Sequence, residues 1–359
     1  MKKISGYEIL PYCVERLYEV VVLMHDLWKG HPDLNVSYFK WKYDDNPYSE
    51  KPLGIMALKD GRVVGFRGFF ASKWYLDEDN KNIFSVLSPG DTCIHPQHRK
   101  VGLSVAMGLK AVDEYSNQYR FFLNTSSTKN SAPGYQKMGY FAIADKSRLM
   151  CYNPLLIFLK RFLRLVKIET KNAKAEFKTG DHDDIQVTVN SYPEEMFELV
   201  SNNRLKSVKI RLYQDLEFYK WRFNDPRNKH LFFYLKKNAK LCAYLVMVLK
   251  DTNRNGIIVD YAFKDKQQLD KLIKFSITKF RFSVFSVFKQ GIDAEVAQIL
   301  IKNGFKSNTF LELRQVKKEG LWPYFVRPIK EDISDIDWMV NGYDVRKIEN
   351  WELKGICMD

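Results

Sequence analysis

The sequence predicts a mixed α/β (α+β) protein built from two tandem copies of one domain, each with a mixed, mostly antiparallel sheet flanked by helices. Three landmarks that recur in the same order carry this prediction. The segment YFKWKY (38–43) returns as FYKWRF (218–223), and both are followed by a strand–turn–strand pattern. Further along, YQKMGYF (135–141) is echoed by ILIKNGFK (299–306). Three landmarks that recur in the same order indicate a duplicated domain.

The length and composition agree with two folded domains. The chain has 359 residues. Domains of ordinary size would divide it into two, or three. Hydrophobic residues make up 45% of the chain and aromatic residues 14%. Such a composition excludes a disordered protein. The net charge of +14 favours an anionic partner, which could be nucleic acid, a phosphorylated cofactor or an acidic membrane face.

The five cysteines lie far apart and form no CxxC pair. We therefore expect reduced thiols in a cytoplasmic protein rather than a disulfide framework or a zinc site. The basic N-terminus lacks the apolar run of a signal peptide, and no apolar stretch is long enough to span a bilayer. The sequence contains no HExxH spacing, so it does not indicate a catalytic metal.

Each half is expected to hold the same elements in the same order. These are an amphipathic helix, a short aromatic helix, a hairpin, a central strand, a helix, a further strand, a short helix that ends at a glycine, and a closing strand. In the first half they fall at residues 14–28, 38–43, 54–66, 83–94, 103–117 and 121–124, with the short helix ending at Gly139. In the second half they fall at 193–202, 218–223, 231–246, 256–262, 267–274 and 281–287, with the short helix ending at Gly304. The predicted divisions are a first domain (1–150), a linker (151–178), a second domain (179–330) and a tail (331–359).

The linker is strongly basic, with seven Lys or Arg and two Glu in residues 160–178. Such a segment is typical of a helix that docks its apolar face on a neighbouring domain. Alternatively, it is an interfacial helix that rests on anionic lipid through residues 155–174, which would place a cytoplasmic protein at the membrane periphery. The aromatic WKY and WRF elements are expected to be core packing. The tail is expected to fold back on a domain, because free tails seldom contain tryptophan and this one has Trp338 and Trp351.

The segment most informative about chemistry is GDTCIHPQHRKVGLS (90–104). A predicted strand ends near Ile94, and a basic loop then leads into a helix. Backbone N–H groups at a helix N-terminus have no intrahelical partner, and the helix dipole favours negative charge there. Arg99 and Lys100 add positive charge, while Gly102 allows close approach of a ligand to the backbone. The loop is therefore a predicted anion site.

This loop resembles a known one. The pattern Arg99-x-x-Gly102-x-Ser104 is similar to the acetyl-CoA pyrophosphate loop of the GNAT family of N-acyltransferases, Q/R-x-x-G-x-G/A, and departs from it at the last position. A second family signature, Y-x-x-x-G-F/Y, is matched by Tyr135 to Tyr140. Pro133-Gly134 before it resembles the branch of the family that modifies bacterial polysaccharides and sugars.

The resemblance implies acetyl-CoA, or another acyl-CoA, as co-substrate. It also implies that the strands at 86–94 and 121–125 splay apart to admit the pantetheine arm. The cofactor-binding residues implied are Ile94, His98, Arg99, Lys100, Val101, Gly102, Leu103, Ser104 and Asn130, with Asn124 as the alternative to Asn130.

For catalysis, Tyr135 resembles the family's tyrosine acid, which protonates the departing thiolate. Acyl transfer to an amine also needs a group that takes a proton from the acceptor. Asp91, Cys93 and His95 alternate along the predicted strand and would share one face. Any of the three could be the base, and a reaction without a dedicated protein base is the remaining alternative.

The second half has no matching loop, since FKDKQQLDKLIKF (263–275) contains no glycine. We therefore expect one active half and one degenerate half that shapes the acceptor site. The expected function is transfer of an acetyl or short acyl group to the amino group of a small molecule, such as an amino sugar of a surface-polysaccharide precursor, by a monomer or dimer that needs no nucleic acid. The alternatives are an aminoacyl transferase that uses aminoacyl-tRNA, as in peptidoglycan cross-bridge synthesis, and a non-catalytic nucleic-acid-binding protein.

Overall fold

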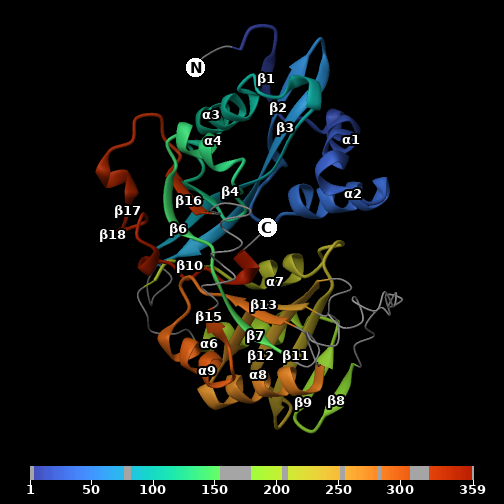
Figure 1. Cartoon of the computed structure of the whole chain (residues 1–359), viewed down its shortest axis with the longest axis vertical. Helices are drawn as coiled ribbons and strands as arrows, with labels where there is room; N and C mark the ends of the chain where they lie inside the picture. The colour runs from blue at the N-terminus through green and yellow to red at the C-terminus, as the bar shows by residue number, and fades with distance from the viewer. Residues whose placement is uncertain are drawn as a thin grey trace, which may run out of the picture.

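A computed structural model describes residues 4–76, 82–153, 179–203, 209–250, 255–280, 284–307 and 323–357. It confirms the predicted fold class, with two eight-stranded sheets that each carry helices. The halves lie one above the other along the long axis of the molecule (Figure 1). The part of the predicted linker after Asn153, including the membrane-contact segment 155–174, lies outside the described residues.

The first sheet is antiparallel except where β4 runs parallel to β5. Its order is β1 (Glu8–Pro11), β2 (Leu53–Lys59), β3 (Arg62–Tyr75), β4 (Ile83–Ile94), β5 (Phe121–Asn124), β16 (Pro323–Pro328) and β6 (Phe141–Asp145), with β10 (Arg211–Leu212) paired to β3. Its helices are α1 (Leu17–Trp28), α2 (Pro32–Phe39), the π-helical turn η2 (Lys40–Asp44), α3 (Leu103–Tyr115) and α4 (Ala132–Lys137). Alternation along β2 sends Met56 toward α1 and Ile55 toward α3, so the helices cover opposite faces.

The second sheet repeats this plan. Its order is β15 (Lys306–Ser307), β7 (Arg148–Tyr152), β14 (Val284–Phe288), β13 (Asn255–Phe263), β12 (Lys240–Lys250), β11 (His230–Lys237), β9 (Ile185–Thr188) and β8 (Gly180–His182). Its helices are α6 (Pro193–Asn202), α7 (Leu216–Arg222), α8 (Lys266–Phe280) and α9 (Ala294–Lys302). The single parallel pair is again the central strand with the strand that follows the long helix, here β13 with β14.

The hairpin turns confirm the duplication at the level of the backbone. Asp60 and Gly61 connect β2 to β3 with φ of 50° and 73°, and Asn238 and Ala239 connect β11 to β12 with φ of 49° and 61°. Two successive left-handed residues are typical of the tight hairpin turn whose twist matches that of paired strands.

Three strands pair outside the half that contains them in the sequence. The short strand β10 lies in the second half of the chain but pairs with β3 of the first sheet. The strand β7 follows the first half directly but lies between β14 and β15 of the second sheet. The strand β16 comes late in the chain but lies between β5 and β6 of the first sheet. The predicted boundaries at 150, 178 and 330 stay predictions, and strand pairing ties the halves together across them.

The two repeated tryptophans form a reciprocal contact between the halves. Trp41 Nε1 donates to the backbone oxygen of Trp221 at 2.9 Å, and Trp221 Nε1 donates to the backbone oxygen of Trp41 at 2.6 Å. The rings stack with centroids 5.3 Å apart, and the two side chains are only 7% and 8% exposed. A contact in which each copy offers the same groups is that of a symmetric dimer. The tryptophans of the WKY and WRF elements are thus core packing, as predicted.

The tail folds back on both halves, since Arg120 of the first half donates to Met339 O and Gly355 packs against Val259 of the second. Trp351 is fully buried, lies edge-on to Trp74 with centroids 5.3 Å apart, and donates its indole N–H to Val345 O at 2.8 Å. Within the residues that the structure describes, no helix is both long enough and apolar enough to cross a bilayer.

The reciprocal tryptophan contact predicts a large loss of stability when either ring is removed. Trp41→Ala deletes a buried indole and leaves the Trp221 carbonyl without its donor, so the free energy of unfolding should fall by about 3 to 5 kcal/mol. Urea denaturation measures this change.

The control is Tyr18→Ala on α1, because the Tyr18 side chain is 74% exposed. This substitution should change the free energy of unfolding by no more than about 0.5 kcal/mol. Equal effects of the two substitutions would contradict the role of the tryptophan contact.

Candidate functional site

The two central strands of the first half, β4 and β5, separate where the sequence predicts a gap. The pairing of β4 with β5 covers Val86 with Phe121 and Leu87 with Phe122, and no backbone pairing follows although β4 continues to Ile94. A β-bulge lies in the part of β4 that no longer pairs with β5. On the β3 side of β4, Gly90 and Thr92 pair with consecutive residues of β3, while Asp91 between them has no partner. Asp91 has φ of 37° there. Bulges commonly redirect a side chain next to an active site.

The predicted anion loop lies directly after β4. Pro96 to His98 form one 3-10 turn, and α3 begins with Gly102 as its N-cap residue at φ of 92°. The helical hydrogen bonds start with the N–H groups of Val105 and Ala106, which both donate to Gly102 O. The N–H groups of Leu103 and Ser104 come earlier in the first turn than those of Val105 and Ala106. They lie at the positive end of the helix dipole.

The side chains of the loop are mostly open to solvent. Arg99, Lys100 and Val101 are exposed, while Ile94 and Ser104 are half-buried and Leu103 packs in the core. Arg99 Nε donates to Ile94 O at 2.8 Å, which holds the base of the side chain over the end of β4. His98 Nδ1 lies 2.9 Å from the Tyr7 hydroxyl. The loop therefore presents exposed cations beside a helix N-terminus, as the anion site requires.

Tyr135 on α4 is buried next to the gap between the strands. Asn124, the last residue of β5, donates from Nδ2 to Tyr135 Oη at 2.8 Å and to Pro89 O of β4 at 2.7 Å. Its side chain thus bridges the two strands where their backbones no longer pair. Asn130 is instead exposed in the turn before α4, so the structure brings Asn124 rather than Asn130 to the predicted acid.

Asp91 is the centre of a buried ion pair on the opposite face of the sheet. Its carboxylate accepts from Lys42 Nζ at 2.6 Å, from the Tyr43 hydroxyl at 2.8 Å and from Trp28 Nε1 at 3.0 Å. The Lys42 side chain is 2% exposed and that of Asp91 is 12% exposed. Burial alone would raise the pKa of Asp91, but the Lys42 charge and the three donors hold it below its usual range. A carboxyl with a lowered pKa is a weak proton acceptor, which counts against Asp91 as the base.

The other two predicted bases differ in exposure. Cys93 faces α1 as Asp91 does, and its thiol donates to Leu23 O at 3.3 Å. Burial raises the pKa of Cys93, so the thiol stays protonated at neutral pH. His95 lies outside the strand, is exposed, and has its ring centroid 5.6 Å from that of His98. The prediction that the three residues share one face of the strand is therefore right for Asp91 and Cys93 and wrong for His95.

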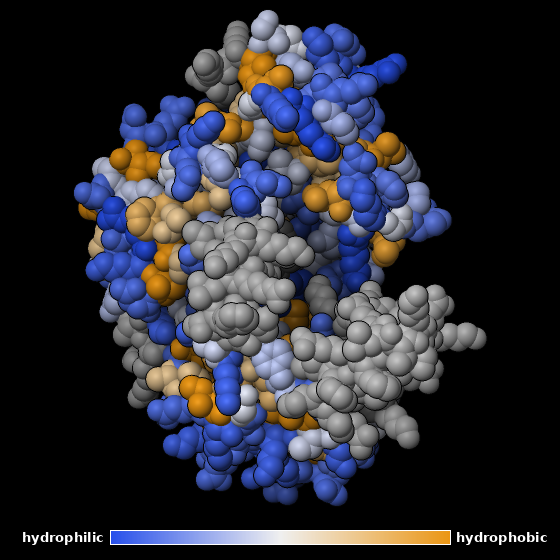
Figure 2. Space-filling view, viewed as in Figure 1, coloured by the Kyte–Doolittle hydropathy of each residue, from blue (hydrophilic) through white to orange (hydrophobic). Residues whose placement is uncertain are grey.

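Rings of the first half and an arginine of the second half surround the Lys42–Asp91 pair. Lys42 Nζ lies 5.5 Å from the ring centroids of Tyr38 and Phe70. Arg227 of the second half lies 4.7 Å from the Tyr38 ring and donates to Trp28 O at 3.0 Å. Figure 2 shows the surface hollowed between the two halves, in the region that Figure 1 places between α2 and α7.

Sequence reasoning missed Lys42, Tyr43 and Arg67. Lys42 and Tyr43 fall in the element expected to be core packing with Trp41, although a lysine between two large aromatic residues is itself a signal of a buried cation. Arg67 interrupts the apolar run RVVGFRGFF (62–70), and an arginine in the middle of a buried strand is rare unless it is paired. Each of these residues breaks a local pattern that would otherwise be uniformly apolar.

In the second half, the C-terminal tail lies where the central strands part. Pairing of β13 with β14 ends at Ile258 and Val287. Gly355 of the tail packs so closely there that an added Cβ would stand 2.8 Å from Val259 Cα and 3.1 Å from Ile258 O. Arg222 Nε donates to Ile356 O, and Lys354 Nζ donates to Tyr261 O at 2.9 Å. In the second half, the chain itself thus fills the gap between the central strands.

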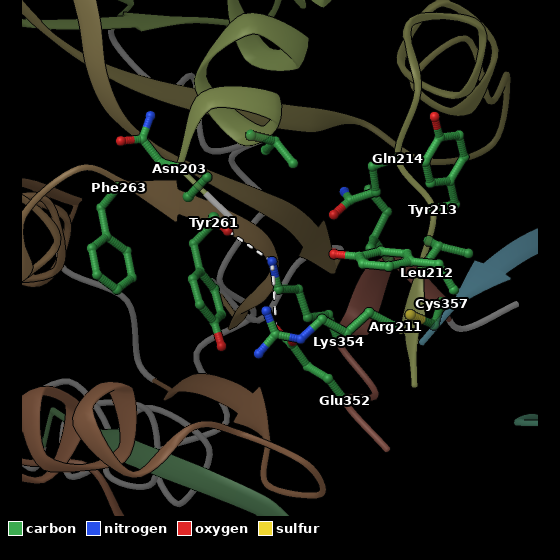
Figure 3. Close-up of a pocket in the computed structure, with 14 residues that line it drawn as sticks. Asn203, Arg211, Leu212, Tyr213, Gln214, Tyr261, Phe263, Glu352, Lys354 and Cys357 are labelled. Atoms are coloured by element: carbon green, nitrogen blue, oxygen red, sulfur yellow. Dashed lines mark hydrogen bonds and ion pairs between the residues drawn. The ribbon is translucent and has the colours of Figure 1, made fainter. Parts of the chain in front are cut away.

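Beside this tail lies a pocket of about 70 Å³ (Figure 3). Lys354 reaches Asp260 at 3.3 Å and Glu352 at 3.8 Å, and Arg211 pairs with Glu352 at 2.7 Å. Burial alone would lower the pKa of Lys354, but Asp260 and Glu352 raise it. The charges of this pocket are satisfied by one another, which suits a structural ion network that fixes the tail.

The fold is that of known acyltransferases, although sequence similarity is faint. No family model matches the chain, and no curated protein matches it. A probable N-acyltransferase from Enterococcus faecalis superposes with a TM-score of 0.60 at 11% identity over 90% of this chain and 72% of the other. A GCN5-related N-acetyltransferase from Anabaena variabilis gives 0.58 at 10% identity over 90% and 73%. A tandem GNAT protein from the clavulanic acid biosynthesis pathway gives 0.50 at 12% identity over 91% and 100%. The chain has the fold of tandem GNAT proteins.

The Asp91–Lys42 pair predicts a pH-dependent contribution to stability. Because the folded-state pKa of Asp91 is lowered, its contribution is full above the unfolded pKa of about 4 and is lost as pH falls through the folded value. Asp91→Asn leaves Lys42 buried without its counter-ion and should cost about 3 to 5 kcal/mol at pH 7. Urea denaturation at pH 7 and near pH 3 should show the difference between wild type and variant shrinking in acid.

The matched control for this experiment is Asp113→Asn. Asp113 pairs with Lys110 at 2.6 Å on the surface of α3, where its side chain is 48% exposed. Removing that pair should cost at most about 1 kcal/mol at pH 7. A variant Asp91→Asn as stable as Asp113→Asn would contradict the buried ion pair.

The close approach of the tail predicts that Gly355 tolerates no side chain. Gly355→Ala forces backbone against backbone and should lower the free energy of unfolding by about 1 to 3 kcal/mol. The control is Gly134→Ala on α4, since an added Cβ there meets nothing within 4 Å. Helix propensity should leave the stability of the control unchanged or raised by up to about 1 kcal/mol. Thermal and urea denaturation of both variants test this, and a neutral Gly355→Ala would show that the tail does not fill the gap.

Proposed function

We propose that the protein is an acyltransferase that binds acyl-CoA in its first half and transfers an acetyl or other short acyl group to an amino group of a small acceptor. The fold of the chain supports acyl transfer as the class of reaction. The acceptor class that we put first is an amino sugar, such as one carried by a surface-polysaccharide precursor.

One observation carries the proposal. The unpaired ends of β4 and β5 open directly beside the N-terminus of α3, and a buried tyrosine lies at the inner end of the same opening. A pyrophosphate at Gly102 and Ser104 would accept first-turn N–H groups and lie next to Arg99 and Lys100. A pantetheine arm that runs inward from there between the strands would bring its thioester toward Tyr135.

The proposed reaction needs three proton and charge events. The neutral amine of the acceptor attacks the thioester carbonyl carbon, the C–S bond breaks, and the amide forms. A backbone N–H freed from the ladder at the Asp91 bulge would polarise the carbonyl oxygen. Tyr135 would protonate the departing thiolate, and the proton of the acceptor ammonium would leave through the acceptor side. His95 and Asp91 stay the proposed acceptors of that proton, with Asp91 the weaker.

The acceptor side supports a polar ring with an amino group. The half-buried rings of Trp28 and Tyr38, over which the Arg227 guanidinium lies, border the Asp91 carboxylate with apolar faces, and the Asp91 side chain is 12% exposed. Sugars stack on such faces while their hydroxyl and amino groups bind nearby polar side chains. The intact anion loop favours this function over transfer from aminoacyl-tRNA, which needs no site for the CoA pyrophosphate.

Calorimetric titration with acetyl-CoA tests the cofactor site. Arg99→Glu places a carboxylate beside the proposed pyrophosphate and should weaken binding at least about tenfold. The control Lys266→Glu makes the same charge reversal at the first turn of α8, the matching helix of the second half, and should leave the affinity unchanged. Absence of binding to the wild type, or equal loss in both variants, would contradict the proposed site. Release of free CoA thiol with a panel of amino sugars and other amines then identifies the acceptor.

A further inference from the structure

Arg67 of β3 is a buried cation next to Tyr135. Its side chain is 1% exposed, and its guanidinium carbon lies 4.9 Å from the centroid of the Tyr135 ring. The Tyr135 ring also stacks on Phe325 of β16 with centroids 5.4 Å apart. The tyrosine is thus held by a guanidinium and a phenyl ring.

The hydrogen bonding of Arg67 is incomplete. Nη1 donates to Ser104 O at 3.2 Å and lies 3.4 Å from Ser104 Oγ, in the first turn of α3. Nε and Nη2 are buried and make no hydrogen bond to the described residues, and no carboxylate among those residues forms an ion pair with Arg67. Burying a charge without an anionic partner costs free energy of folding. Arg67 is therefore expected to face an anion in another state of the protein.

The charged and titratable groups around Tyr135 identify that anion. Tyr140 packs edge-on to Tyr135 with centroids 5.0 Å apart. Burial raises the pKa of Tyr140 in spite of the nearby charges of Arg67 and Arg327, so Tyr140 stays neutral. From β5, Asn124 contributes an N–H that donates to Tyr135 Oη. The described contacts of Tyr135 therefore include the Arg67 cation and a hydrogen-bond donor, both of which favour a negatively charged phenol oxygen.

We propose that Arg67 is a positioning residue that holds the Tyr135 ring and stabilises the phenolate formed when Tyr135 protonates the departing thiolate of CoA. This inference rests on the proposed function. In the step, the Tyr135 O–H bond breaks, an S–H bond forms on CoA, and the electron pair stays on the phenol oxygen near the Arg67 charge. The acceptor's released proton, delivered through solvent, restores the phenol. Arg67 also joins this tyrosine to Ser104, and so couples the acid to the loop that binds the cofactor phosphates.

Direct titration of the tyrosine tests the inference. Difluorotyrosine at position 135 of the full chain reports its own ionisation through the ¹⁹F chemical shift. Arg67→Met and Arg67→Gln remove the charge and should raise the pKa of the fluorinated phenol by roughly one to two units, while Arg67→Lys should raise it less. Arg148→Gln is the matched control, because it removes a guanidinium that lies 4.6 Å from the Phe288 ring in the second half, and it should leave the pKa unchanged.

The variants should fold, because methionine removes a buried charge and keeps most of its volume. Circular dichroism melts and the affinity for acetyl-CoA verify this. An unchanged pKa in both Arg67→Met and Arg67→Gln would overturn the inference. The titration needs neither acceptor nor activity, so it stands apart from the proposed function. Where transfer is measured, kcat should fall about ten- to a hundredfold with KM for acetyl-CoA nearly constant. A loss confined to KM would also overturn the inference.

Discussion

The paired indoles of Trp41 and Trp221 fix how the two halves of the protein meet. Each donates to the other's backbone, so each half completes the hydrogen bonding of the other. The residues that follow these tryptophans make different contacts in the two halves. Lys42 binds the Asp91 carboxylate at the bulge of β4, whereas Arg222 reaches the carbonyl oxygen of Ile356 in the tail. Side chains next to one symmetric contact thus have different partners in the two halves.

The halves differ most where their central strands part. Duplication gives both sheets the same parallel pair and the same divergence beyond it. In the first half a glycine-capped helix with exposed cations stands beside the opening, and the Asn124 side chain bridges it. In the second half the tail fills the opening and brings Lys354 and Glu352 into an ion network. A chain segment that packs against backbone leaves no room for a cofactor, so the physical asymmetry agrees with the loss of the loop in the sequence.

Local patterns predicted the elements well, and distant pairing was not predictable from them. The bounds expected for the central strand and the strand after it agree with β4 and β5, because apolar runs between turn residues are local signals. The positions of β7 and β16 depend on which sheet offers a strand edge for them to pair with. No local sequence pattern encodes this. The contacts of Asn124, Lys42 and Arg67 depend on residues far away in the sequence. Asn130 illustrates the difference, since its place before Tyr135 suggested a contact that the structure gives to Asn124. The catalytic and cofactor roles of the loop and of Tyr135 stay predictions.

The central claim is that one half binds acyl-CoA and the other cannot. A crystal structure of the protein with coenzyme A at saturating concentration tests it most directly. The account predicts one coenzyme A per chain, with its pyrophosphate at Gly102 and Ser104 and its thiol beside Tyr135 Oη. Coenzyme A between β13 and β14, or a first half that stays empty at saturation, would contradict it.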